Sequence, residues 1–551
     1  MTTLIPREPY SQEELKQLYP NGLKLELVQV FLRHGKKLGS MMHTVGQRIS
    51  NWHQASARRF LHAFKMYVHL SVIDRLIPDW PYCSVARQMV QMAASNHELS
   101  AWNGFQWRRK MESFGNKDEA VVAVGAGGAI EGICQHGELT DKGRETTFAL
   151  GQRLRHLYVD QLGFMPKVKE DAEDMYLRAT PIPRALESLQ QAFWGMYPSN
   201  ARTLDFPPPV IVGRSVSEET LFPNEGNCRR FRQLARLFAD RAAARWNESE
   251  QMDYLNKIWS KYMPESSPKV AVDAHPRLSG IMDTVNATDA HGPATKLPSE
   301  FYDKKGRAIM DRIAVEEWFA GYNESSEYRK LGIGALLGDV VDRMVSTAVD
   351  GGWRSESSAS GSGKPGAGKS IKFAMSGCHD TTLAAILSSV GSFQDESWPP
   401  FTSSVAIEMF SQAPSGRADA GTVLEEFSNP SVASKKPGVL SSLFGGTKST
   451  SKQPAPSETA RTPISSLPEE TREDLRKHYV RIRYNDRPVR IPGCAAKSEN
   501  HLPGDETFCT LDAFKSIVDK FTPKNWSAEC MQNLGEGLYG PGEQERIPAG
   551  F

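Results

Sequence analysis

The chain has 551 residues, with 66 Lys and Arg against 65 Asp and Glu, and a formal net charge of +1. This length exceeds what one hydrophobic core usually organises, so we expect a main domain with a second lobe or large insertions. The balanced charge argues against nucleic acid as a partner, so any phosphate binding must be local.

The start of the chain and its cysteines suggest a compartment. The first ten residues lack the apolar core of a secretion signal, and no apolar run is long enough to span a bilayer. We expect a soluble protein without a transmembrane segment, located in the cytoplasm or mitochondria. Seven cysteines, outside any C-x-x-C spacing, indicate neither a disulfide scaffold nor a zinc site. Reduced thiols are expected, although Cys494 and Cys509 could bridge in an oxidising compartment.

The first predicted element is a buried strand over residues 25–32, an apolar-rich and partly alternating run. Arg33-His34-Gly35 follows it directly. The tripeptide therefore lies at the carboxyl end of a strand, the edge where open α/β sheets bind ligands.

A second unit begins with a helix that has Thr140 as its N-cap. A short strand over 175–177 follows, then Arg178 and a helix with Arg184 in its first turn. The apolar face of this helix is predicted to comprise Ile182, Leu186, Leu189 and Phe193. Residues 221–346 are predicted to be mainly helical and to form a lobe that caps the sheet.

Two segments, 355–370 and 414–468, are rich in Ser, Gly, Pro and Lys and are predicted to be flexible linkers. Within the first, residues 363–370 match the G-x-x-x-x-G-K-S pattern of phosphate-binding loops. They precede a strand-like run instead of opening a helix, so we expect no nucleotide site there.

Between the linkers, a strand over 371–375 leads to His379-Asp380 at the start of a helix, a second strand-to-helix junction. Residues 534–551 are predicted to be a loosely held tail. We divide the rest into an α/β catalytic domain, 1–220 with 347–533, and the helical cap lobe.

These residues match the needs of phosphate-ester cleavage. The reaction needs a nucleophile, cations that hold the phosphate oxygens, and an acid that protonates the leaving alcohol. His34 can supply the nucleophile, Arg33, Arg184 and His379 the cradle, and Asp380 the acid. Alone, each motif is more often a surface or core feature, and Arg178 and Arg184 could be a solvated pair. Three motifs that each follow a predicted strand favour the catalytic interpretation.

With these residues the chain resembles the histidine acid phosphatases of the histidine phosphatase superfamily, branch 2, and most closely the lysophosphatidic-acid phosphatase type and its fungal relatives. The resemblance is carried by blocks in family order: Arg33-His34-Gly35, Gly137-Glu138-Leu139-Thr140, Phe148-Ala149-Leu150-Gly151, Leu177-Arg178-Ala179-Thr180, Leu221-Phe222-Pro223-Asn224, His379-Asp380-Thr381-Thr382, Trp398-Pro399-Pro400-Phe401 and Pro492-Gly493-Cys494.

The resemblance implies a phosphoglycerate-mutase-like α/β sheet domain with a helical cap, and no metal or other cofactor. It implies that His34 is the phosphorylated nucleophile and Asp380 the proton donor. Arg33, Arg184 and His379 match phosphate-holding positions, and Arg178 matches an arginine that supports the pocket.

One position departs from the family pattern. Lys37 stands where the family has a second phosphate-holding arginine. Loss of a bidentate donor could cost about 2–4 kcal/mol of transition-state stabilisation. An impaired, phosphate-binding pseudoenzyme of the same fold is therefore the alternative.

Residues 36–75 form an atypical insertion that resembles nothing in the family. We hypothesise a retained intron or gene-model error, which continuous transcripts across this region would exclude. Alternatively the insertion is genuine, because its apolar residues could line an amphipathic helix, which could also contact a membrane surface.

We therefore expect an acid phosphatase that acts on small phosphate monoesters, lysophosphatidic acid or small organic phosphates among them. An acidic optimum follows if Asp380 must be protonated. A phosphomutase is a third alternative. We make no prediction of the oligomeric state.

Overall fold

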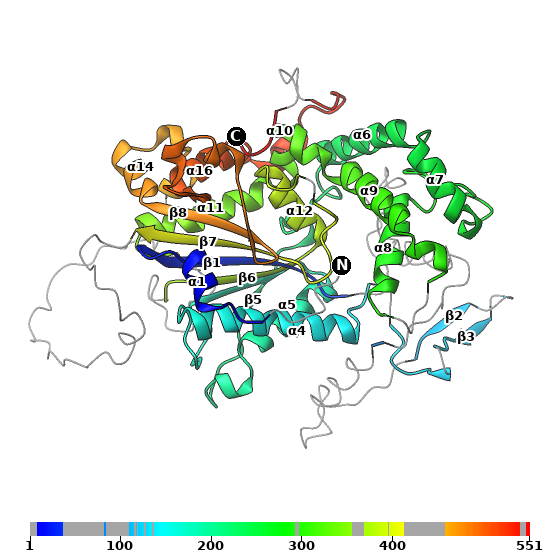
Figure 1. Cartoon of the computed structure of the whole chain (residues 1–551), viewed down its shortest axis with the longest axis horizontal. Helices are drawn as coiled ribbons and strands as arrows, with labels where there is room; N and C mark the ends of the chain where they lie inside the picture. The colour runs from blue at the N-terminus through cyan, green and yellow to red at the C-terminus, as the bar shows by residue number, and fades with distance from the viewer. Residues whose placement is uncertain are drawn as a thin grey trace, which may run out of the picture.

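The computed structural model describes residues 8–36, 82–83, 110–114, 117, 119–125, 128–134, 137–292, 297–354, 369–394, 396–412, 458–539 and 547–551 (Figure 1). The insertion over 37–75, most of the first linker and residues 414–457 of the second lie outside this part. No helix in the described part is long and apolar enough to cross a membrane.

A nine-stranded sheet forms the centre of the molecule, in the order β10-β11-β8-β7-β1-β6-β4-β5, with β9 paired to β8 (Figure 1). The strands are β1 (Leu23–Arg33), β4 (Met175–Ala179), β5 (Ile211–Val212), β6 (Phe373–Cys378), β7 (Ser404–Gln412), β8 (His478–Tyr484), β9 (Arg487–Val489), β10 (His501–Leu502) and β11 (Asp505–Thr510). A separate hairpin joins β2 (Glu112–Phe114) and β3 (Ala120–Val122). Strands β1, β6, β4 and β5 run parallel, and β7 and β8 are antiparallel to their neighbours. The sheet is therefore mixed, and with the helices around it the predicted α/β class is confirmed.

Helices cover both faces of the sheet. The α- and π-helices of the described residues are α1 (Gln12–Leu18), α4 (Asp141–Arg155), η3 (His156–Gln161), α5 (Pro183–Met196), α6 (Arg229–Trp246), α7 (Glu250–Trp259), α8 (Leu278–Asp289), α9 (Lys304–Glu324), α10 (Ser326–Arg329), η9 (Lys330–Gly334), α11 (Ala335–Val349), α12 (Asp380–Ser389), α13 (Glu458–Arg461), α14 (Glu469–Arg476), α15 (Pro492–Ala495), α16 (Leu511–Asp519) and α17 (Trp526–Glu529). Alternate residues of β1 face opposite sides. Val28 and Val30 pack with α4 and α5, and Leu27 and Phe31 with α11, α12 and α16.

Helices α6 to α9 lie to one side of the sheet in Figure 1. Most of their apolar side chains form a cluster separate from the two sheet cores, with Trp259, Phe301 and Ile313 at its centre. Helix α11 instead packs on the sheet, where Gln29 of β1 donates to the carbonyl of Val340. The last part of segment 221–346, helix α11, therefore packs into the core of the sheet domain and not into the cluster of α6 to α9.

Three disulfides join six of the seven cysteines: Cys83–Cys134, Cys228–Cys530 and Cys494–Cys509. The prediction of reduced thiols is therefore wrong, and the pair that it left open is bridged. Two of the bridges span 51 and 302 residues, so no local spacing could have revealed them. Disulfides persist in oxidising compartments. The location of the protein stays a prediction.

Two segments that were expected to be loose are packed where the structure describes them. The end of the second linker forms α13, in which Ala460 is buried and Arg461 pairs with Asp339 at 2.7 Å. Residues 547–551 of the tail also make backbone hydrogen bonds, from Ala549 N–H to the carbonyl of Asn323 among them. These contacts could not be predicted from the polar composition of the two segments, because backbone groups and charged side chains make most of them.

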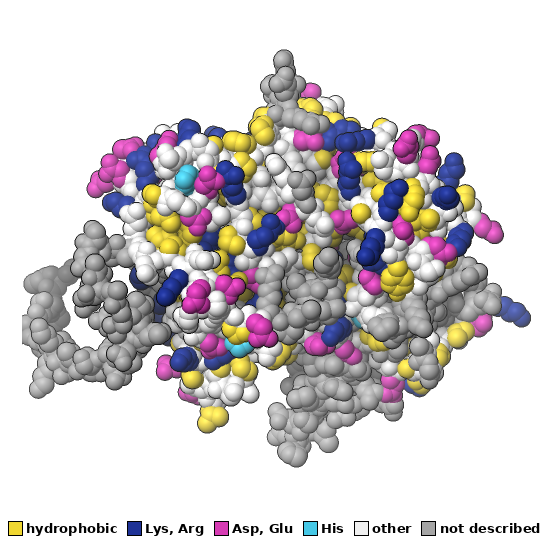
Figure 2. Space-filling model, in the orientation of Figure 1, with side chains coloured by type: hydrophobic (Ala, Val, Ile, Leu, Met, Phe, Trp, Pro, Cys, Tyr) yellow, Lys and Arg dark blue, Asp and Glu magenta, His cyan; other side chains and the backbone are white. Residues whose placement is uncertain are grey.

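Charges of both signs are interspersed over the face of the molecule in Figure 2. This agrees with the formal net charge of +1. On this face no large area of one sign would attract a polyanion.

A buried ionic cluster ties β7 to β8 on the side of the sheet that carries α1. The carboxylate of Glu408, fully buried, accepts hydrogen bonds from Arg481 at 2.7 and 2.9 Å, Tyr19 at 2.6 Å and Tyr158 at 2.8 Å. Burial raises the pKa of this carboxyl, but Arg481 and Arg483 outweigh burial and lower the pKa to about 2. The cluster therefore needs an ionised Glu408.

Replacing Glu408 with glutamine is expected to lower the free energy of unfolding by about 3–5 kcal/mol at pH 7, because two buried guanidinium groups lose their counter-charge. The folded-state pKa lies below the unfolded value, so this stabilisation is full above about pH 4.5 and disappears as the pH falls towards 2. Urea unfolding at several pH values, with the exposed Glu248→Gln as control, measures it. A Glu408→Gln protein as stable as the wild type at pH 7 would contradict this role.

Candidate active site

Three parallel strands end at the same edge of the sheet and bring the separated motifs together. Arg33 at the end of β1 pairs in register with Cys378 at the end of β6, and Ala179 of β4 pairs with Gly377. The next residues along each strand are therefore neighbours. The rings of His34 and His379 lie 5.4 Å apart between centroids, and Nε2 of His379 lies 3.1 Å from the hydroxyl of Thr180.

The backbone after β1 is held from two sides. The N–H of His34 donates to the carbonyl of Cys378 at 3.0 Å, and the N–H of Gly35 donates to Ser188 Oγ at 3.0 Å. A side chain at Gly35 would overlap the carbonyl of Gly143 in α4. Only glycine therefore lets this loop approach the first turn of α4.

His34 is buried and its ring is oriented by its own loop. Nδ1 lies 2.8 Å from the carbonyl oxygen of Gly35. A carbonyl can only accept, so Nδ1 carries the proton, and the lone pair of the neutral ring is on Nε2. This tautomer is the one in which Nε2 can act as a nucleophile.

Arg33 contacts the second junction directly. Its Nη2 lies 2.7 Å from Oδ2 of Asp380, and the side chains are 4% and 17% exposed. The guanidinium also donates to the carbonyl of Pro399 and lies 4.0 Å over the ring of Phe401. Stacking and hydrogen bonds together hold the guanidinium plane in one orientation.

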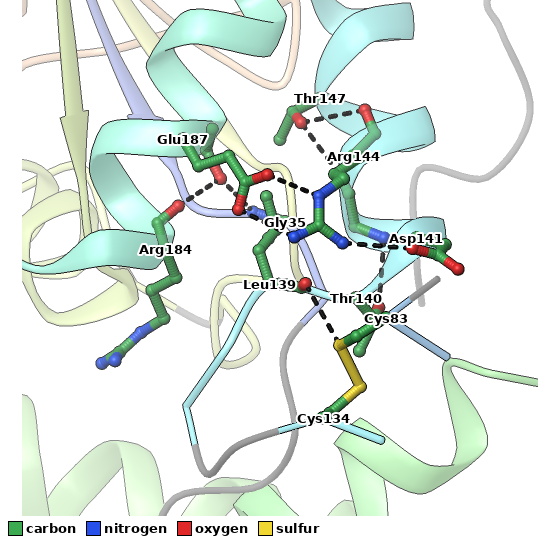
Figure 3. A network of polar contacts seen from close by, with 12 residues as sticks. Gly35, Cys83, Cys134, Leu139, Thr140, Asp141, Arg144, Thr147, Arg184 and Glu187 are labelled. Atoms are coloured by element: carbon green, nitrogen blue, oxygen red, sulfur yellow. Dashed lines mark hydrogen bonds and ion pairs between the residues drawn. A yellow bond between two sulfur atoms is a disulfide. The ribbon is translucent and has the colours of Figure 1, made fainter. Parts of the chain in front are cut away.

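Arg184 is a buried cation in the first turn of α5, and Figure 3 shows its guanidinium directed away from the neighbouring Glu187. Within the described part of the chain, its Nε has no hydrogen-bond partner. Burial lowers the pKa of Arg184, Asp283 and Asp380 raise it, and Arg33 lowers it further. A buried guanidinium with an unsatisfied donor is a site for an anion.

The starts of α4 and α5 are cross-linked beside this site. Arg144 of α4 binds Glu187 of α5 through two hydrogen bonds of 2.5 and 3.0 Å, and it also contacts Asp141 (Figure 3). Ser188 of α5 donates to the carbonyl of Arg184 at 2.7 Å. The bidentate pair thus fixes the two helices that position Gly35 and Arg184.

Arg178 is linked to the site through a chain of hydrogen bonds. Its Nη2 binds the buried carboxylate of Glu219 at 2.5 Å, which also accepts the N–H of Leu221 at 2.7 Å. The carbonyl of Leu221 accepts the hydroxyl of Thr382, which in turn accepts the N–H of His379 at 3.3 Å. This chain of contacts joins Arg178 to the backbone of His379.

Lys37 lies outside the described residues, so the structure does not place it. Its neighbour Lys36 is fully buried and donates to the carbonyl of Ala290, just after α8, at 2.7 Å. Burial is the main cause that lowers the pKa of Lys36 to about 8. Lys36 thus joins the loop after His34 to the helices beside the sheet.

The sequence motifs missed the segment from Trp398 to Thr402, although it was noted as a family block. Trp398 Nε1 donates to Asp380 at 3.0 Å, Phe401 stacks on Arg33, and Thr402 N–H donates to the carbonyl of His34 at 3.3 Å. No motif assigned it a role, because tryptophan and proline have no catalytic pattern.

Taken together, the site offers two neighbouring imidazoles, two buried guanidinium groups and one carboxyl group. In the described part, no group of three or more His, Cys, Asp or Glu residues could hold a metal ion. The side chains at this edge can bind an anion, attack it and transfer a proton.

Known proteins resemble the chain over most of its length. The model of the histidine phosphatase superfamily (branch 2) matches residues 24–426. A Schizosaccharomyces pombe protein named "probable acid phosphatase" is 34% identical over 520 residues, 93% of this chain and 95% of that protein. Human lysophosphatidic acid phosphatase type 6 is 26% identical over 275 residues, 50% of this chain and 57% of its own length.

Among solved structures, Hafnia alvei phytase in complex with tartrate matches with a TM-score of 0.49 and 12% identity, covering 93% of this chain and 99% of the phytase.

Proposed function

The chain belongs to branch 2 of the histidine phosphatase superfamily, and on that premise we propose that it hydrolyses phosphate monoesters through a phosphohistidine on His34. One observation carries the proposal: Nε of the buried Arg184 has no hydrogen-bond partner in the described part of the chain, and the contact of His34 Nδ1 with a carbonyl favours the tautomer with its lone pair on Nε2. An anion site and a nucleophile thus lie at one sheet edge.

The phosphate is held by cations that the fold has already oriented. Arg33 is fixed by Phe401 and Pro399, and Arg184 by the first turn of α5. Planar guanidinium groups bind phosphate oxygens in pairs and stay charged throughout the reaction. His379, close to His34, is the third donor, and we expect Lys37 to supply a point charge.

In the first step Nε2 of His34 attacks phosphorus, the P–N bond forms, and the bond from phosphorus to the ester oxygen breaks. The electron pair leaves with that oxygen, and Asp380 supplies its proton. In the second step water attacks phosphorus, the P–N bond breaks, and Asp380 accepts a proton from the water. Inorganic phosphate is released, and His34 and Asp380 return to their starting forms.

The ion pair between Arg33 and Asp380 links phosphate binding to the protonation of the acid. Arg33 favours the ionised carboxylate, which cannot donate a proton. A phosphate oxygen competes for the same guanidinium and adds negative charge near Asp380. Bound substrate therefore favours the protonated acid that the first step needs, and activity should be highest at acidic pH.

We propose small phosphate monoesters as substrates, with lysophosphatidic acid among them. This finer assignment is supported by the 26% identity to human lysophosphatidic acid phosphatase type 6. The presence of lysine at position 37 favours one alternative, a phosphate-binding pseudoenzyme of the same fold.

Phosphate release from 4-nitrophenyl phosphate, glycerol 3-phosphate and lysophosphatidic acid, followed between pH 4 and 8 with the full chain, tests the proposal. Turnover of these esters with an acidic optimum is expected. If no ester is turned over but inorganic phosphate still raises the unfolding temperature, the chain is a phosphate-binding pseudoenzyme and not a phosphatase. A rate on lysophosphatidic acid no higher than on glycerol 3-phosphate would remove the lipid from the proposed substrates.

A further inference from the structure

Asp380 receives hydrogen bonds on both carboxylate oxygens. Oδ1 accepts the N–H of Thr381 at 2.8 Å, and Oδ2 accepts Nη2 of Arg33 at 2.7 Å and Nε1 of Trp398 at 3.0 Å. Arg33 is also needed to hold phosphate. Trp398 is therefore the donor that can stay with Oδ2 when phosphate engages Arg33.

Trp398 is itself anchored by helix α9. Its backbone N–H lies 3.1 and 3.3 Å from the two carboxylate oxygens of Asp311. Its ring packs against Phe319 at 4.8 Å and against Trp318 at 6.1 Å between centroids. Contacts with α9 therefore hold the indole in position.

We propose that Trp398 is a positioning residue, which holds Oδ2 of Asp380 towards the leaving oxygen of the substrate. The inference rests on the proposed function. An indole N–H donates one hydrogen bond and accepts none, so it orients the carboxyl group without competing for its proton. Through Asp311 and Phe319, helix α9 thereby sets the geometry of proton transfer.

The proposal predicts a dependence on the leaving group. Glycerol 3-phosphate releases a basic alkoxide that needs the proton, whereas 4-nitrophenolate is a stable anion that needs it much less. Trp398→Phe keeps an aromatic ring but removes the donor. We compare kcat/KM, which reports the first step and not the hydrolysis of the phosphoenzyme that both esters share. We expect kcat/KM on glycerol 3-phosphate to fall roughly 10- to 100-fold, and kcat/KM on 4-nitrophenyl phosphate to fall less than about threefold.

The pH profile gives a second readout. A hydrogen bond to the ionised carboxylate stabilises that form, so its loss raises the pKa of the acid. The alkaline limb of the rate on glycerol 3-phosphate should therefore move to higher pH in Trp398→Phe. A residue that only stabilised the fold would lower both rates equally and leave this limb in place.

Trp259→Phe is the matched control. Its Nε1 donates to the carbonyl of Glu300 at 3.0 Å within the core of α6 to α9, far along the chain from the site motifs. The rates of this variant on the two esters should keep their wild-type ratio. Should Trp398→Phe fail to fold, Asp311→Ala removes the anchor of the Trp398 backbone, and the same selective loss is expected.

The outcomes separate the two proposals. A wild-type chain that hydrolyses neither ester would overturn the proposed function and this inference with it. An active wild type together with a folded Trp398→Phe that loses both rates equally, or neither, and keeps its alkaline limb would overturn the inference alone.

Discussion

Replacing His34 with alanine is expected to lower kcat on 4-nitrophenyl phosphate by at least about 10⁴-fold, because the first P–N bond can no longer form. The cations around it remain, since Arg33 is held by Phe401 and Arg184 by α5. Affinity for inorganic phosphate, measured by calorimetry, should therefore change less than about tenfold. Steady-state kinetics with thermal unfolding as a folding check measures the effect.

His156→Ala is the control for a histidine outside the site. Its side chain is 51% exposed on η3 and pairs with the nearby Asp160. This variant should keep wild-type kinetics. A folded His34→Ala protein with more than a tenth of wild-type activity would show that another group carries the phosphoryl transfer.

Replacing Asp380 with asparagine is expected to lower kcat on glycerol 3-phosphate by roughly 10²- to 10⁴-fold. Asparagine has nearly the same shape, and its single amide oxygen can still accept the N–H of Thr381 in place of Oδ1. The amide cannot give up a proton to the alkoxide. The loss on 4-nitrophenyl phosphate should be smaller in the first step, because that leaving group departs unprotonated.

Single-turnover kinetics separate the two steps for this variant. Formation of 4-nitrophenolate should remain fast, while release of inorganic phosphate becomes slow, since Asp380 also accepts the proton of the attacking water. Equal losses on both esters, with no lag between the two products, would contradict the acid and base role of Asp380.

The central sheet and the edge that carries the site could be predicted from sequence. An apolar run before Arg33 and another before His379 predicted two strands, and the structure pairs them directly as β1 and β6. Strand ends are readable because burial on both faces demands continuous apolar residues. That two such ends face one another follows from parallel pairing.

Contacts set by tertiary packing could not be predicted. Leu186 was expected on the apolar face of its helix, yet it is 38% exposed, whereas Arg184 and Ser188 are buried. Periodicity identifies a helix, but the buried face of α5 is set by the approach of Gly35 and Arg144. The polar Arg184 and Ser188 are therefore buried at the site, whereas the apolar periodicity of the helix predicted that Leu186 would be.

The role of Trp398 was likewise hidden from sequence reasoning. It lies 18 residues after Asp380 and its backbone is held by Asp311, 87 residues away. Hydrogen bonds between residues so far apart have no spacing signature. The same reason explains the missed bridge between Cys228 and Cys530.

The phosphoenzyme itself tests the central claim most directly. The full chain is mixed rapidly with a ³²P-labelled phosphate ester, quenched in alkali within milliseconds, and digested for peptide mapping. The account predicts a label that is stable to base and labile to acid, as a phosphoramidate is, located on His34 and absent from His34→Ala. A label that survives acid, or that maps to any other residue, would contradict it.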